Sequence, residues 1–204
     1  MGNNGYNIDA IRAEIATAAA RLIAEDGADY ATAKRKAARQ VLGNTKVRGE
    51  IMPDNEQIEE EVRQYNELFF GDTQPARLLH LRKLALRMMG ELSQFSPFLT
   101  GAVLNGTAGE HSDIYLQLFS ESAKDVEIFL LNKNVDFEVS EGTPARGGEP
   151  VETLSFLWQN EGIHLSLYDK DDLRRVPKSA SDGRILRADV DAVRTLIENT
   201  ENNE

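Results

Sequence analysis

The feature that most constrains the fold of this chain is a change of periodicity at Phe95-Ser96-Pro97. Before this point, apolar residues recur every three or four positions, which is the spacing of helices that bury one side. After it, short alternating or β-rich runs dominate, as they do in strands. A helical half followed by a strand-rich half predicts an α+β protein, in which an N-terminal helical region packs on a small mixed sheet with flanking helices.

Glycine and proline divide the first half into separate helices. Gly27, Gly43 and Gly71 each follow an amphipathic segment and are well placed to end it. Pro75 suits the first turn of the helix that begins near Asp72 or Thr73. We therefore expect helices over about residues 9–26, 32–42, 54–70 and 73–92.

The second half is expected to contain five strands and two helices. The segment Gln159-Asn160-Glu161-Gly162 separates the last two strands and predicts a hairpin, with the glycine at a position that tolerates a positive φ. The expected strands cover residues 98–104, 113–119, 135–139, 152–158 and 163–168, and the helices 122–132 and 188–198. This gives three regions: a helical region at 1–96, a sheet core at 97–170, and a C-terminal loop and helix at 171–204.

Composition excludes several classes of protein. The 204 residues, 41% of them hydrophobic, are enough for one large or two small domains. A net charge of −11 opposes indiscriminate binding to phosphate backbones, so no general DNA binding is expected. The absence of cysteine excludes disulfides, thiolate metal sites and cysteine nucleophiles, and fits a reducing compartment. No apolar run approaches the length of a membrane span, so we expect a cytoplasmic protein without membrane contact.

Two common catalytic motifs are missing from the sequence. There is no Gly-x-Ser-x-Gly elbow, so nothing in the sequence supports a serine hydrolase. There is also no Gly-x-x-Gly-Lys-Ser/Thr phosphate loop, which an ATP-dependent ligase of the muramate–alanine type would carry.

Residues 100–119 combine a glycine-containing segment with an aspartate at the start of an expected strand. Gly101-Ala102 is followed by Gly106-Thr107, and ten residues, 103–112, separate Ala102 from Asp113. This stretch resembles the metal-binding core of the nucleotidyltransferase superfamily, where a strand ending in Gly-Ser or Gly-Gly precedes a strand that opens with Asp-x-Asp. The resemblance covers about residues 97–170.

The resemblance implies roles for individual residues. Gly101, Ala102, Gly106 and Thr107 would contact a nucleoside triphosphate, and Asp113 would bind Mg²⁺ and act in catalysis. Paired carboxylates suit this chemistry, because residues i and i+2 of a strand share a face and Mg²⁺ prefers oxygen ligands.

The sequence departs from the family pattern at the metal site. Ala102 stands where the family has serine or glycine, and Tyr115 stands where it has the second aspartate. A phenol is neutral and does not replace a carboxylate as a magnesium ligand. The third carboxylate would come either from Asp136 and Glu138 or from the position of His164. Element order favours His164, which again lacks the carboxylate.

Three hypotheses follow. The first is a nucleotidyltransferase-like protein with a degenerate metal site, which serves as a nucleotide-binding or interaction module and holds Mg²⁺ weakly at most. The second is an active metal-dependent transferase that uses Asp113 with a substitute carboxylate from Asp136, Glu138 or Glu127. The third is a structural or partner-binding protein, with a protein or RNA as the partner.

One compact basic cluster lies in the acidic sequence. Lys34, Arg35, Lys36 and Arg39 fall on the second expected helix. They could contact the phosphates of a nucleotide or of RNA. The alternative is a solvated helix face that balances acidic neighbours.

Overall fold

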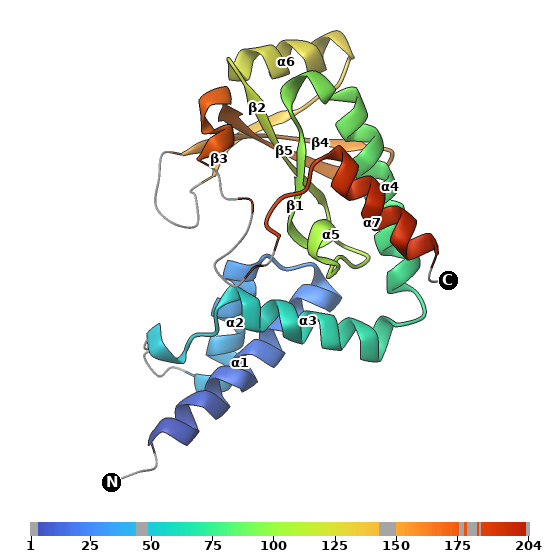
Figure 1. Cartoon of the computed structure of the whole chain (residues 1–204). Helices are drawn as coiled ribbons and strands as arrows, with labels where there is room; N and C mark the ends of the chain where they lie inside the picture. Colours follow the sequence, from blue (N-terminus) through green and yellow to red (C-terminus); the bar gives the residue numbers. More distant parts are fainter. Residues whose placement is uncertain are drawn as a thin grey trace. The chain divides into compact units, whose positions relative to one another are not determined.

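The computed structural model describes residues 4–43, 49–142, 150–175, 178, 183 and 185–202. The chain divides into two compact units. The first comprises residues 1–77 with 107–111, and the second comprises residues 78–106 with 112–204. Helices precede a mixed sheet along the chain (Figure 1), so the α+β fold class is confirmed.

The first unit is helical, as expected. It contains α1 (Asn4–Asp26), α2 (Tyr30–Leu42), α3 (Asn55–Phe70) and the first turn of α4 (Gln74–Glu91). Asp54 and Gln57 form a reciprocal capping box that fixes the start of α3. The buried core is rich in alanine, which lets the helices of this unit approach closely; it includes Ile15, Ala16, Ala19, Ala20, Ala33, Ala37, Ala38, Ile58 and Val62.

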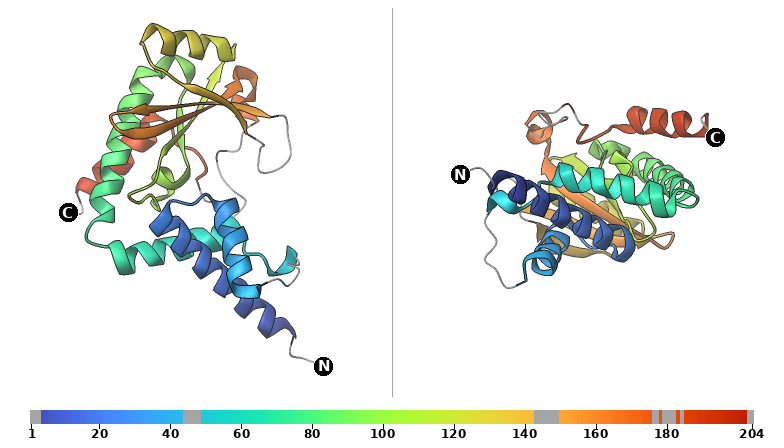
Figure 2. Two further views of the ribbon diagram at one scale, coloured as in Figure 1. Left: turned by 180° about the vertical axis from the view of Figure 1, so that it is seen from behind. Right: turned by 90° about the horizontal axis from the view of Figure 1, so that it is seen from below.

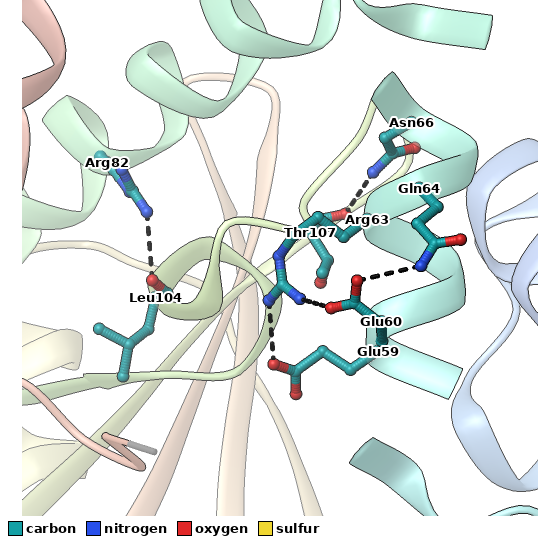
Figure 3. A network of polar contacts seen from close by, with 8 residues as sticks. All are labelled: Glu59, Glu60, Arg63, Gln64, Asn66, Arg82, Leu104 and Thr107. Atoms are coloured by element: carbon teal, nitrogen blue, oxygen red, sulfur yellow. Dashed lines mark hydrogen bonds and ion pairs between the residues drawn. The ribbon is translucent and has the colours of Figure 1, made fainter. Parts of the chain in front are cut away.

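The segment 107–111 belongs to this helical unit although it lies far along the chain. The buried Asn66 amide donates to the Thr107 carbonyl at 3.0 Å (Figure 3). Gln74 donates to the Ala108 carbonyl at 2.8 Å, and Arg77 donates to the Glu110 carbonyl at 3.0 Å. The segment 107–111 is neither helix nor strand, so side chains of α3 and α4 supply the hydrogen bonds that its backbone carbonyls need.

The second unit is built on a five-stranded sheet in the order β1-β2-β5-β4-β3. β2 and β5 are parallel, and the other neighbours are antiparallel. Figure 2 shows these strands from two further directions. The strands are β1 (Phe98–Thr100), β2 (Ile114–Ser120), β3 (Glu138–Gly142), β4 (Val151–Trp158) and β5 (Glu161–Asp169), and the helices are α5 (Gly101–Asn105), α6 (Ala123–Asn132) and α7 (Val190–Glu201).

One face of the sheet forms the core of this unit. Leu99, Leu116, Leu165 and Leu154 are consecutive partners across four strands, and all are buried. Val126 and Leu130 of α6 are buried as well, and α6 packs on β2 and β5. Burial of this apolar face is the main term that stabilises the sheet.

The structure corrects three details of the expected elements. Residues 101–104 form the start of α5 rather than the end of a strand, because Gly101 turns the backbone at φ 70°. β3 begins at Glu138, so Asp136 precedes the strand. In the hairpin, Gln159 and Asn160 carry the positive φ angles, whereas Gly162 lies within β5.

A buried arginine holds α5 in place. Arg82 donates to the carbonyls of Val103 and Leu104, at 3.0 and 3.1 Å (Figure 3 shows the second contact). These carbonyls lie at the C-terminal end of the helix, where the helix dipole favours a cation. Burial lowers the pKa of the Arg82 guanidinium.

Within the part of the chain that the structure describes, no helix has both the length and the hydropathy needed to cross a bilayer.

Candidate functional site

Asp113 lies immediately before β2, with its carboxylate against the backbone of β5. A Cβ atom added to Gly162 would lie 2.4 Å from Asp113 Oδ1 and 2.5 Å from its Cγ. No side chain fits at position 162 while Asp113 keeps this position. Gly162 therefore provides the space that the carboxylate occupies.

The other two motif positions lie beside Asp113 on the same face of the sheet. Tyr115 in β2 pairs with His164 in the parallel strand β5. Their rings stack, with centroids 4.5 Å apart and planes inclined by 17°. The Tyr115 residue is 45% exposed, so the stack is open to solvent on one side.

His164 links two polar side chains from different strands. Its Nε2 lies 2.9 Å from Asp113 Oδ2, and its Nδ1 lies 2.8 Å from Ser155 Oγ in β4. An ionised carboxylate only accepts hydrogen bonds, so Nε2 must carry the proton that it donates to Asp113. In the neutral imidazole, Nδ1 is then an acceptor, and the Ser155 hydroxyl donates to it.

These contacts belong to a polar row that crosses the whole sheet. Each member pairs with the next in register, so all five side chains share one face. The row runs Thr100, Tyr115, His164, Ser155 and Glu138.

The donor set at this site does not fit magnesium. Asp113 is the single carboxylate among the three motif positions, and its Oδ2 is already hydrogen-bonded to His164. Mg²⁺ requires octahedral oxygen ligation, which an imidazole and a stacked phenol do not supply. Among the described residues, no group of three or more His, Asp or Glu side chains is arranged to hold a metal ion.

The glycine motif surrounds the short helix α5. Gly101 opens the helix, and its Cα lies beside Tyr115, because an added Cβ would be 3.9 Å from Tyr115 Cδ2. Ala102 follows in the first turn, half-buried. Gly106 ends the helix at φ 90°, next to Arg82. Thr107 is buried within the helical unit, where its carbonyl accepts from Asn66.

The substitute carboxylates lie elsewhere in the second unit. Glu138 is on the polar face, but two strands separate it from β2, and adjacent strands are about 4.8 Å apart. Asp136 is exposed and precedes β3. Glu127 of α6 forms a hydrogen bond with Glu152, which pairs with Glu141 and lies on the apolar face. None of the three is brought to Asp113.

The basic cluster lies on α2, in the helical unit. Arg35, Lys36 and Arg39 are exposed, and Arg35 lies 3.5 Å from the Thr32 hydroxyl. Lys34 is half-buried, and burial lowers the pKa of its ammonium, partly offset by the charge of Asp54. A role of this cluster in phosphate binding stays a prediction.

A buried cation occupies another part of the polar face. The guanidinium of Arg187 lies 4.5 Å from the ring centre of Phe98 and 5.2 Å from that of Phe119. Its Nη2 donates to the Leu173 carbonyl at 2.7 Å, while Nε and Nη1 are buried and have no hydrogen-bond partner among the residues that the structure describes. Burial lowers the pKa of Arg187. The faces of the two aromatic rings are favourable electrostatic partners for this cation.

Sequence reasoning missed two residues of the site. Ser155 gave no signal beyond its place in an alternating strand, since its contact with His164 depends on strand pairing. The sequence pattern predicts a turn glycine at Gly162, whereas in the structure this glycine makes room for Asp113. A glycine within a strand is itself a signal of close approach by another group, and this signal could have identified it.

Comparisons with known proteins add little to this geometry. No family model matches the chain, and no curated protein matches it. Among solved structures, one match is the structure of the GLD-2/RNP-8 complex, with 18% sequence identity and a TM-score of 0.31. The match covers 56% of this chain and 48% of that chain, so this chain spans about half the length of the one it matches. A likeness this distant does not indicate a function.

Proposed function

We propose that this protein is a nucleotidyltransferase-like module that does not transfer nucleotides by metal catalysis and acts instead in nucleotide binding or partner interaction. The support is one observation: the three positions that resemble the family's metal ligands come together on one sheet face, but hold Asp113, Tyr115 and His164. Two of the three contact each other through a hydrogen bond, and the third stacks on His164. This arrangement uses the ligand positions for internal contacts.

The motif order along the chain also supports the family resemblance. A strand, a glycine turn and a short helix precede the aspartate that opens β2, and β5 lies parallel to β2 on its other side. Such a scaffold presents side chains from β2 and β5 to one spot. Electrostatic stabilisation of a reacting triphosphate would nevertheless require metal ions that these side chains do not fit.

The experiment that tests the proposal restores the missing carboxylates. We expect the double variant Tyr115→Asp/His164→Asp to gain a thermal shift that requires both a nucleoside triphosphate and Mg²⁺ or Mn²⁺, because ligands that bind only the native state stabilise it. The wild type should show no metal-dependent shift. Ser166→Asp is the matched control, since it adds a carboxylate on the same face of β5 outside the motif.

The outcomes separate the hypotheses. A metal-independent shift of the wild type with one triphosphate would establish nucleotide binding. No shift with any triphosphate would leave the interaction role. Metal-dependent transfer of a labelled nucleotide by the wild type, lost in Asp113→Ala, would overturn the proposal in favour of an active enzyme.

A further inference from the structure

We propose that Ser155 is a nucleophile activated by His164 and Asp113, and that it accepts an acyl group from an ester of a carboxylic acid. Three side chains from different strands form a continuous relay: Ser155 Oγ to His164 Nδ1 at 2.8 Å, and His164 Nε2 to Asp113 Oδ2 at 2.9 Å. A hydroxyl bonded to a base that a third group orients is the arrangement of an activated nucleophile. This activity is separate from the proposed nucleotide or partner binding.

The proton positions suit this role. Asp113 holds the proton of the imidazole on Nε2, which leaves the lone pair of Nδ1 directed at the Ser155 hydroxyl. The carboxylate would also stabilise the imidazolium formed when Nδ1 takes the serine proton. The ring nitrogens are used in the opposite sense from the chymotrypsin-type relay, in which Nε2 faces the serine.

The chemical step balances without a cofactor. Ser155 Oγ forms a bond to the carbonyl carbon as its proton passes to His164 Nδ1. The bond from that carbon to the alcohol oxygen then breaks, and the leaving alkoxide takes the proton from His164. A water molecule repeats the sequence on the acyl-serine, which releases the carboxylic acid and restores the hydroxyl.

An exposed apolar side chain lies near Ser155 on the same face of the sheet. Ser155 is half-buried, and Leu157, two residues along the same face of β4, is 77% exposed. The register partner of Leu157 is Gly162, and the Asp113 carboxylate occupies the space that a side chain at Gly162 would take. An aliphatic acyl chain would therefore lie against the exposed Leu157 side chain, on the same face of the sheet as the serine.

Turnover is expected to be slow. β4 pairs with β3 on one side and β5 on the other, so the backbone N–H groups around Ser155 are used within the sheet. Such donors are what stabilise the oxyanion in efficient acyl transfer. We therefore expect stoichiometric acylation by activated esters to be easier to detect than hydrolysis.

The first experiment uses p-nitrophenyl acetate on the full chain, with p-nitrophenol release and mass spectrometry as readouts. We expect one acetyl group, located on Ser155, that is absent in Ser155→Ala. His164→Gln should slow acylation by about 100-fold or more, the usual contribution of a general base. Ser166→Ala, on the same face and outside the relay, should react like the wild type. Acetylation of other residues, or an unchanged rate in His164→Gln, would overturn the proposal.

A second pair of variants measures activation directly. Because the chain has no cysteine, Ser155→Cys and Ser166→Cys each carry a single thiol. We expect iodoacetamide to alkylate Ser155→Cys at least about tenfold faster, and the difference to vanish when His164→Gln is added. Equal rates for the two thiols would show that His164 does not activate position 155, whatever the result with the ester. Neither readout depends on nucleotide binding, so failure here leaves the proposed function standing.

Discussion

Two rows of cross-strand partners, which lie one residue apart along the same five strands, differ in polarity and in burial. One row runs Leu99, Leu116, Leu165, Leu154 and Val139, and its first four members are buried. The other runs Thr100, Tyr115, His164, Ser155 and Glu138 on the opposite face, and none of these is buried. A shift of one residue in strand register would exchange the two sets.

The leucine row stabilises the fold, whereas the polar row carries the side chains of the candidate site. The leucine row fixes the register because only one face can be buried, and the polar row is then carried to the other face at fixed spacing. Residues of the polar row can change without loss of the core. Residues such as Tyr115 and His164 can therefore differ in type without a change in strand register.

The largest effect is expected from breaking the apolar row. Leu165→Ala should lower the free energy of unfolding by about 2–5 kcal/mol, because it removes buried methyl groups and leaves a cavity. Ser166→Ala, the next residue on the opposite face, should change it by less than about 1 kcal/mol. Urea unfolding followed by circular dichroism measures both. Equal losses would contradict the division of roles between the two faces.

A smaller effect on stability, with a larger one on the site, is expected from Gly162→Ala. The new Cβ would lie 2.4 Å from Asp113 Oδ1, so the carboxylate must move away from His164. We expect a stability loss of about 1 kcal/mol, since the end of a side chain can shift without disturbing the core. Ester acylation of Ser155 should fall clearly. Unchanged acylation would mean that Asp113 does not orient His164.

The smallest effect is expected at Glu152, an acidic residue on the apolar face of the sheet. Burial, and then the charge of Glu127, raises the pKa of Glu152 above its ordinary value of 4.5. The folded state therefore binds a proton more readily than the unfolded state. Stability should fall as the pH rises from about 4.5 through the raised pKa. Glu152→Gln should flatten this slope slightly, as thermal melts between pH 4 and pH 7 would show. An unchanged slope in Glu152→Gln would contradict this role of Glu152.

Much of the fold could be predicted from sequence. The helices other than α5, together with β2, β4 and β5, follow from local periodicity, because each element buries one side of a regular structure. β1 and β3 were misplaced by a few residues for the opposite reason: short elements carry little periodicity. The apolar run Ala102-Val103-Leu104 suits a buried helix as well as a strand, and only the backbone of Gly101 decides between them.

The candidate site also contains residues that the sequence pattern predicts and residues that only the structure reveals. Motif spacing relates Gly101, Asp113 and Tyr115 to one another, and element order adds His164, because the motif predicts which neighbouring segments carry these residues. Ser155 and Gly162 could not be assigned roles, since their contacts depend on the pairing of β4 with β5 and on the side-chain position of Asp113.

By itself the sequence determined the α+β class, the helical first half and the alternation that gives the sheet an apolar and a polar face. These depend on local pattern and on the burial of apolar side chains. Only the tertiary structure decided that Asp113, His164 and Ser155 join in one relay. Hydrogen bonds between distant residues need atoms within about 3 Å, and strand order and register, rather than residue type, set those distances.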